Sequence, residues 1–365
     1  MLVIFSLLSR RITKANDFHV TPTVSVYRRS LWVAECRSMK AIAIIGTGGP
    51  EVLHIREIPT PEPRGEQVRV RVRACGLNRA DLMQCRGYYP APPGAPADIP
   101  GLEYAGEVDA LGPDVVGPLK LGDRVFGIVA GGGQAEYVLT HERLAVSIPP
   151  NLDFVEAAAV PEAFITAHDA LLTQGRLAPG ERVLVHAAGS GVGTAAIQIA
   201  HAVGSLVWGT ARTADKLERS NALGLDHGID NSNGGFAEVV ASQTMGKGVN
   251  VVIDLLGGSA LAGNLAALAF RGRLVLVGLL AGTSGPLDLS LMLRKRITIV
   301  GTTLRARPLE EKIAATMRFA NEVVPWLKRS LVCPVVDSVF AFEDFADAQA
   351  RVESNLVFGK VVLRL

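Results

Sequence analysis

The chain is poor in cysteine. Its 365 residues include four cysteines, at positions 36, 75, 85 and 333, and no two of them have CxxC spacing. A disulfide framework or a cysteine-held zinc cluster needs cysteines that are paired in the sequence. Both are therefore excluded, and the scattered thiols favour a reducing compartment, so we expect a cytoplasmic protein.

An excess of charge of one sign is also missing. Lys and Arg number 37 and Asp and Glu 35, which leaves a net charge of +2 without a concentrated basic stripe in the body of the chain. Nucleic-acid-binding domains usually carry such a stripe. We therefore expect no nucleic acid partner.

Long apolar runs are lacking as well. Residues 1–8 are apolar but too short to span a bilayer, and Arg10 and Arg11 follow the run, whereas a secretory signal places its charge first. We expect no membrane association.

The rest of the first 38 residues is rich in Arg, Ser and Thr, as in an organelle transit peptide, yet Met39 directly precedes a strand-like segment at 40–45. We expect residues 1–38 to be a leader outside the fold. A transit peptide with organelle import, a mis-assigned start and a disordered arm all stay open.

The feature that is present and most informative is the glycine-rich stretch at 186–194. It follows an apolar strand-like segment at 182–187 and precedes an apolar-faced helical segment at 195–203. Glycines let the backbone approach a pyrophosphate, which the helix N–H groups and dipole stabilise. The spelling is not the strict GxGxxG, and taken by itself such a turn is as typical of an ordinary strand–helix junction.

The sequence around this turn repeats strand, helix and strand. Further apolar strand-like segments lie at 206–211, 249–254 and 273–278, with helical segments between them. Strands this continuously apolar are typical of sheets covered by helices on both faces. Residues from about 166 to 303 therefore predict a doubly wound parallel sheet, a Rossmann domain that the turn can serve.

The end of the second strand bears on the choice of nucleotide. A carboxylate there would bind a ribose 2′-hydroxyl and repel a 2′-phosphate. Here Arg212 and Lys216 can bind the phosphate by charge, and Thr213 by its hydroxyl. NADPH is therefore favoured over NADH, although Asp215 brings a negative charge nearby and the two cations could be merely solvated.

The region from 39 to about 161 has a different pattern. Residues 67–74 alternate Val and Arg, as a half-buried antiparallel strand requires. Short strand-like segments at 104–110, 123–129 and 134–139 are separated by Gly and Pro, which predicts a compact β-rich domain. Residues 332–342 and 359–365 have the same character, and we expect them to return to this domain.

Several motifs in register carry a family resemblance. They are ACGLNRADLMQ at 74–84, GYY at 87–89, PGLE at 100–103, GDRV at 122–125, GGGQAEY at 131–137, AAAVPEA at 157–163, the glycine turn, LRKR at 293–296 and GK at 359–360. With them the chain resembles a zinc-independent quinone oxidoreductase of the medium-chain dehydrogenase/reductase superfamily, closest to the p53-inducible branch.

The resemblance implies an α/β fold with a GroES-like β-rich catalytic domain and a Rossmann domain. The GroES-like domain would cover residues 39–164, and the NADPH-binding Rossmann domain residues 165–304. Residues 305–365 would return to the catalytic domain.

The resemblance also bears on metal. Zinc-dependent relatives place a Cys in the NRAD motif and a His in the PGLE motif, where this chain has Asn78 and Leu102. Neither side chain replaces those zinc ligands, so we expect no metal site. The substrate expected without a Lewis acid is an electron-poor quinone or α,β-unsaturated carbonyl, reduced by hydride from NADPH.

Two residues are the catalytic candidates. The pocket tyrosine of the family falls on Tyr89, with Tyr88 as a rival, and its hydroxyl would donate a hydrogen bond to the acceptor carbonyl. Asn78 is the second polar candidate. Loop packing and a turn or cap role remain the alternatives for them, and Glu162 and Cys75 are interpreted as structural.

The resemblance also assigns nucleotide contacts. The residues expected to bind the pyrophosphate are Ser190, Gly191, Val192 and Gly193. The residues expected to flank the nicotinamide are Thr166, Gly278, Leu279 and Leu304. Many relatives have a tyrosine near the 2′-phosphate where this chain has Asn231, so the NADPH preference rests on Arg212 and Lys216.

Other functions stay open. An NADPH-dependent alkenal or enoyl-thioester reductase would share every cofactor residue, and a low-turnover NADPH-binding sensor or structural protein would share the coenzyme site. A homodimer is expected, because the last strand of the Rossmann sheet, at 297–300, would be an unpaired edge in a monomer.

Overall fold

A computed structural model describes residues 37–365 of the chain. The expected leader, residues 1–38, lies almost entirely outside the described residues, as does Cys36. No helix among residues 37–365 combines the length and the apolar character needed to cross a membrane.

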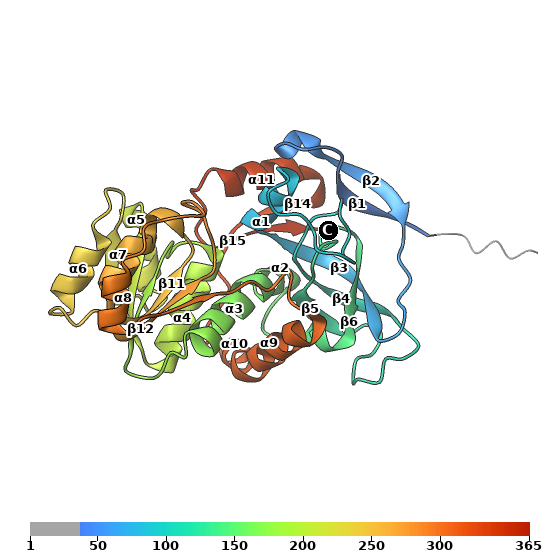
Figure 1. The fold of residues 1–365 in the computed structure, drawn as a ribbon. Coiled ribbons are helices and arrows are strands. Elements are labelled where there is room, and N and C mark those ends of the chain that lie inside the picture. Colours follow the sequence, from blue (N-terminus) through green and yellow to red (C-terminus); the bar gives the residue numbers. More distant parts are fainter. Residues whose placement is uncertain (1–36) are drawn as a thin grey trace, which may run out of the picture. The chain divides into compact units, whose positions relative to one another are not determined.

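One of the two large sheets is parallel and has six strands in the order β10-β9-β8-β11-β12-β13. Figure 1 shows its strands β11 and β12 together with the helices α4 to α8. Its strands are β8 (Arg182–Val185), β9 (Leu206–Ala211), β10 (His227–Asp230), β11 (Val249–Asp254), β12 (Leu268–Leu276) and β13 (Thr298–Gly301). Its helices are α4 (Gly191–Val203), α5 (Ala214–Asn221), α6 (Phe236–Gln243), α7 (Leu261–Ala267) and α8 (Leu289–Lys295). This is the predicted doubly wound sheet, with the order of strands reversing between β8 and β11.

The other large sheet has the order β14-β15-β3-β4-β5-β7, with β6 also paired to β3. Its strands are β3 (Gln67–Leu77), β4 (Glu103–Leu111), β5 (Arg124–Ile128), β6 (Tyr137–His141), β7 (Val146–Ser147), β14 (Val336–Ala341) and β15 (Lys360–Arg364). A hairpin of β1 (Ser38–Ile44) and β2 (Leu53–Pro59) stands beside it. The remaining helices are α1 (Arg79–Cys85), α2 (Phe154–Ala158), α3 (Pro161–His168), α9 (Leu309–Glu322), α10 (Val324–Lys328) and α11 (Phe345–Glu353).

Strand β3 follows its sequence pattern with one departure. Val68, Val70 and Val72 are buried, as the alternation predicts. Arg69 is buried too, because its guanidinium bonds to Asp109 at 2.7 Å and to Glu62 at 2.8 Å. A buried arginine is tolerated only when its charge is paired in this way.

The two sheets meet through the last strand. Strand β15 pairs antiparallel with β3, Leu363 lying opposite Cys75. Just before β15, the N–H of Gly359 donates to the carbonyl of Gly189 at 2.9 Å, and Gly359 forms a parallel bridge with Ser190. The glycine turn of the parallel sheet is therefore fixed to the start of β15 in the other sheet.

Candidate active site

The glycine turn begins helix α4. Ser190 caps this helix, its Oγ accepting from the N–H of Gly193 at 3.0 Å. Gly191 and Val192 occupy the first helical positions, whose N–H groups have no partner inside a helix. A Cβ on Gly193 would lie 2.3 Å from the Ala187 carbonyl oxygen, and one on Gly191 would lie 2.6 Å from Lys360 Cδ. At Gly193 the backbone leaves no room for a side chain, and at Gly191 a side chain would displace Lys360. The N–H groups at the start of the helix remain available to an anion.

Lys216 lies across this turn. A Cβ on Gly189 would lie 2.9 Å from Lys216 Cδ, and Lys216 Nζ donates to the carbonyl of Asn355 at 2.6 Å. Arg212, at the end of β9, is exposed. Burial, followed by repulsion from Arg212, lowers the pKa of Lys216. The structure thus brings Lys216 close to the pyrophosphate turn, and Arg212 close enough to influence it electrostatically.

A third cation belongs to this cluster. Arg79, the first residue of α1, donates from Nη2 to the side-chain oxygen of Asn355 at 2.6 Å and to the Val352 carbonyl at 3.1 Å. Burial, followed by repulsion from Arg212, lowers the pKa of Arg79. Sequence reasoning missed Arg79, because it lies 133 positions before Arg212 in another domain and no spacing connects the two.

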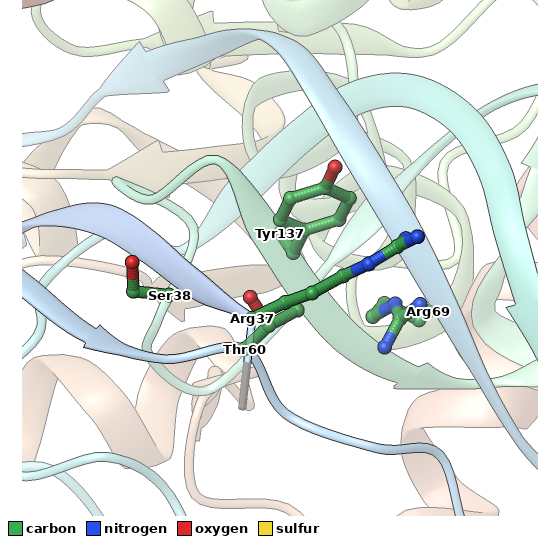
Figure 2. Close-up of a pocket in the computed structure, with 5 residues that line it drawn as sticks. All are labelled: Arg37, Ser38, Thr60, Arg69 and Tyr137. Atoms are coloured by element: carbon green, nitrogen blue, oxygen red, sulfur yellow. The ribbon is translucent and has the colours of Figure 1, made fainter. Parts of the chain in front are cut away.

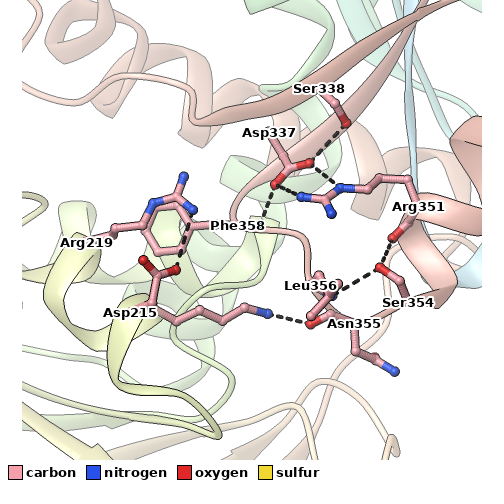
Figure 3. A network of polar contacts seen from close by, with 10 residues as sticks. Asp215, Arg219, Asp337, Ser338, Arg351, Ser354, Asn355, Leu356 and Phe358 are labelled. Atoms are coloured by element: carbon pink, nitrogen blue, oxygen red, sulfur yellow. Dashed lines mark hydrogen bonds and ion pairs between the residues drawn. The ribbon is translucent and has the colours of Figure 1, made fainter.

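The neighbouring Asp215 does not neutralise this cluster. Its carboxylate faces Arg219 at 3.8 Å, one helical turn along α5 (Figure 3). Asn231, just after β10, keeps a buried Oδ1 without a hydrogen-bond partner among residues 37–365. An acceptor is therefore still available beside the end of β9.

Asn78 belongs to a buried polar network. Its Oδ1 accepts from Lys360 Nζ at 2.6 Å, and its Nδ2 donates to Glu103 Oε1 at 2.8 Å. Lys360 Nζ also lies 2.5 Å from Glu103 Oε1. Asp81 accepts from the backbone N–H groups of Asn78 and Gly101, and burial raises its pKa to about 6. The cap role foreseen as an alternative for Asn78 is present, and one N–H of its amide remains for another partner.

Tyr89 is held by an arginine. Arg305, itself buried, donates from Nη1 to the Tyr89 carbonyl at 2.9 Å and lies 5.1 Å from the centre of its ring. The Tyr89 hydroxyl is 3.4 Å from Thr303 Oγ1. Tyr88, the rival, is 74% exposed, and its side chain makes no such contact with the part of the chain that the structure describes. Of the two tyrosines, Tyr89 is the one with a fixed position.

The four expected nicotinamide neighbours come from three elements or their ends. Thr166 lies on α3, Gly278 and Leu279 follow β12, and Leu304 follows β13. Leu304 is buried, whereas Leu279 is 53% exposed. Leu304 directly precedes Arg305, so the Tyr89 contact and this group adjoin each other in the chain.

Comparison with known proteins shows which families the two parts of the chain match. Residues 191–322 match the family described as Zinc-binding dehydrogenase, and residues 64–150 match the Alcohol dehydrogenase GroES-like domain. The quinone oxidoreductase of Homo sapiens is 33% identical over 334 residues, which is 90% of this chain and 98% of that protein. The chain belongs to the quinone oxidoreductase family of the medium-chain dehydrogenase/reductase superfamily.

Solved structures have the same fold. A quinone oxidoreductase of Pseudomonas syringae is 30% identical with a TM-score of 0.80, over 90% of this chain and 100% of that one. A mycobacterial protein solved in complex with NADPH is 28% identical with a TM-score of 0.80, over 90% and 100%. An enoyl reductase, CurK, is 27% identical with a TM-score of 0.80, over 90% and 99%. This member of the quinone oxidoreductase family is an oxidoreductase, and its expected GroES-like and Rossmann fold is confirmed.

In this quinone oxidoreductase family member the two motif positions that hold zinc in the metal-dependent relatives have other roles. Asn78 is hydrogen-bonded within the Lys360–Glu103 network, and Leu102 is 2% exposed. Within residues 37–365 no three His, Cys, Asp or Glu side chains are grouped to hold a metal ion.

A separate cavity of about 410 Å³ lies at the base of the β1–β2 hairpin (Figure 2). The residues that line it are Arg37, Ser38, Thr60, Arg69 and Tyr137. None of them is an expected site residue, and Arg69 already has its charge paired. We therefore place the candidate active site at the glycine turn and its neighbours, and not at this cavity.

Proposed function

We propose that the protein reduces quinones with NADPH by hydride transfer and without a metal. The observation that carries the proposal is the position of Lys216, whose side chain crosses the glycine turn. Arg212 lies close enough to help lower the pKa of Lys216 and that of Arg79. A helix N-terminus and three cations suit a dinucleotide with an additional phosphate.

Each part of the coenzyme has residues that fit it. The N–H groups of Gly191 and Val192 would bind the pyrophosphate, and Arg212, Lys216 and Arg79 the 2′-phosphate. The unpartnered Oδ1 of Asn231 would accept a hydrogen bond from the adenosine end. Thr166, Gly278, Leu279 and Leu304 would flank the nicotinamide, which supplies a hydride when bound.

The acceptor would bind near Tyr89 and Asn78. The Tyr89 hydroxyl, fixed by Arg305 and facing Thr303, would donate a hydrogen bond to a carbonyl oxygen. Asn78 would orient the reactants through its remaining N–H. An electron-poor acceptor accepts hydride with this weak polarisation, so a quinone suits a site whose zinc positions are Asn78 and Leu102.

Steady-state oxidation of NADPH and of NADH, each with a panel of quinones and enals, tests the proposal. Quinone turnover with a clear preference for NADPH supports it. Tight NADPH binding without oxidation by any acceptor would favour a sensor or structural role instead.

An alkenal or enoyl-thioester reductase is the second candidate. The structural likeness to an enoyl reductase favours it, and every coenzyme contact proposed above would be shared. If, in the same panel, enals or enoyl thioesters were reduced much faster than quinones, this second function would be favoured.

We also propose a homodimer formed along β13. Among residues 37–365 this strand pairs only with β12, and it ends the order of the parallel sheet. Large exposed apolar side chains belong to elements next to this edge, namely Phe270, Leu279, Leu280, Leu289 and Leu293. Pairing β13 with a second copy would remove the open edge and cover apolar surface.

The assignment of residues 39–164 and 305–365 to the catalytic domain, and of 165–304 to the coenzyme domain, is part of the proposal. The pairing of β15 with β3 supports it. A reducing compartment such as the cytoplasm suits the free thiols of Cys75, Cys85 and Cys333.

A further inference from the structure

Helix α3 presents two partly open side chains on one face. Of its eight residues, only Glu162 and Thr166 are partly accessible, and the other six are buried. Residues four apart in a helix lie one turn apart on the same side. Glu162 therefore faces the same space as Thr166, the residue proposed to lie beside the nicotinamide.

Within residues 37–365 no cation forms an ion pair with the carboxyl group of Glu162. Its backbone N–H donates to Glu103 Oε2 at 2.8 Å, while Glu103 Oε1 is bound by Lys360 and Asn78. The charge of Lys360 is thus matched by Glu103. Within residues 37–365 the carboxyl group of Glu162 has no hydrogen-bond or ion-pair partner, so it can act on a bound molecule.

The charged groups around Glu162 come from five elements or their ends. They are Glu103 on β4, Asp81 on α1, Lys360 on β15, Arg305 after β13 and Lys312 on α9. Burial, and then repulsion by Glu103, raises the pKa of Glu162 to about 8, although Lys360 and Arg305 oppose this. The carboxyl group therefore holds a proton at neutral pH.

We propose that Glu162 is the general acid of the reaction and donates its carboxyl proton to the oxygen of the reduced acceptor. The inference rests on the proposed function. When the hydride is transferred to one oxygen of a quinone, the first O–H bond forms, the ring becomes aromatic and the other oxygen is left as an anion. The O–H bond of Glu162 then breaks as the second O–H bond of the hydroquinone forms, and the Glu162 carboxylate takes a proton back from water.

Proton donation of this kind stabilises the oxyanion of the reduced acceptor, as a metal ion would. A zinc ion would stabilise the oxyanion as a Lewis acid, whereas a protonated carboxyl group neutralises it. Asn78 has no ionisable proton, and Tyr89 can donate a hydrogen bond to the acceptor. Glu162 is the side chain in this group that both carries a transferable proton at neutral pH and faces Thr166.

The variant Glu162→Gln tests the role, because glutamine keeps the shape but cannot transfer a proton. Glu162→Asp keeps a carboxyl group at this position. The matched control is Glu238→Gln, on the exposed face of α6. Infrared titration of each full chain without coenzyme measures the carbonyl stretch of protonated carboxyl groups. NADPH binding is measured by fluorescence, and kcat/KM with naphthoquinone is measured against pH.

In the unaltered chain and in Glu238→Gln we expect an infrared band of a protonated carboxyl group that disappears as pH rises through about 8. This band should be missing from Glu162→Gln. The kcat/KM of the unaltered enzyme should fall above the same pH. The kcat/KM of Glu162→Gln near neutral pH should be roughly 100-fold lower than that of the unaltered enzyme. It should also no longer decrease at alkaline pH. The affinity of this variant for NADPH should be unchanged, and Glu162→Asp should recover part of the rate.

Different results would reject the general-acid role of Glu162 and the proposed function. Normal turnover by Glu162→Gln with the alkaline decline intact, or a Glu162 that is ionised at neutral pH, would overturn the general-acid role alone. Failure of the unaltered chain to bind NADPH would reject the proposed function, while the infrared titration would still measure the protonation of Glu162.

Discussion

Lys360 and Glu103 form a buried ion pair, with Lys360 Nζ 2.5 Å from Glu103 Oε1. Both side chains are almost fully buried, at 5% and 0% exposure. The lysine stem lies against Gly191 and its head donates to the Leu77 carbonyl and to Asn78. A single side chain thus joins the coenzyme turn to the proposed catalytic residues.

Replacing Lys360 by Met should destabilise the fold by about 3–5 kcal/mol, because Glu103 would be left as an unpaired buried charge. Chemical denaturation measures the change. The double variant Lys360→Met with Glu103→Gln should recover part of the loss. Equal stability of the single and double variants would contradict the pairing.

Replacing Arg212 and Lys216 together by Ala should raise the KM for NADPH by roughly 100-fold or more, since charge-assisted hydrogen bonds contribute about 1.5–3 kcal/mol each. The KM for NADH should change little. Lys247→Ala, an exposed cation outside the site, is the control. Equal rises for both coenzymes would reject the assignment.

The sequence predicts those parts of the site whose interacting residues lie close together along the chain. The glycine turn and the alternation in β3 involve neighbouring residues, so local pattern predicts them, and the fold class follows and is confirmed. The cap of Asn78 is local too. Its bond to Lys360 joins residues 282 positions apart, and no spacing in the chain encodes it.

The same limit applies to Arg79 and Glu162. Their significance comes from neighbours on other elements, namely Arg212 for Arg79 and Glu103 for Glu162. Glu162 lies in the AAAVPEA motif at 157–163, yet the sequence analysis interprets it as structural, because a motif does not show which charges surround a side chain. Burial and unmatched charge become visible only when the chain is folded.

Tyr89→Phe should lower kcat/KM for quinones roughly tenfold, because the variant loses one hydrogen bond to the acceptor oxygen. NADPH binding should not change, since the hydroxyl is directed toward Thr303. Tyr88→Phe, at the exposed neighbouring position, should behave as the unaltered enzyme. A loss confined to Tyr88→Phe would reverse the assignment.

Stability should depend on pH through Glu162. Its pKa is raised from 4.5 to about 8 in the fold, so the folded state binds more protons than the unfolded chain between these values. Stability is then fully present below about pH 4.5 and decreases as pH rises through about 8.

The variant Glu162→Gln removes this dependence. It should match the unaltered chain near about pH 5 and exceed it by at least about 1 kcal/mol above about pH 8, measured by chemical denaturation. Asp81 contributes a change of the same sign in both proteins, because its pKa is also raised. Parallel stability curves for the two proteins would contradict the prediction.

A charge on the edge strand should break the proposed dimer. Ile299→Lys introduces a cation into β13, and lysine on an edge strand discourages pairing with another chain. Sedimentation should give a monomer for this variant and a dimer for the unaltered chain. Val116→Lys, at an 87% exposed site elsewhere, should remain dimeric.

The pairing of β15 with β3 also governs the order in which the molecule can be completed. Residues 74–77 are synthesised early, but their partners at 361–364 emerge from the ribosome almost 290 residues later. The parallel sheet lies wholly between them and can close first. During translation, this part of the β3 edge therefore stays unpaired until the last residues of the chain have been made.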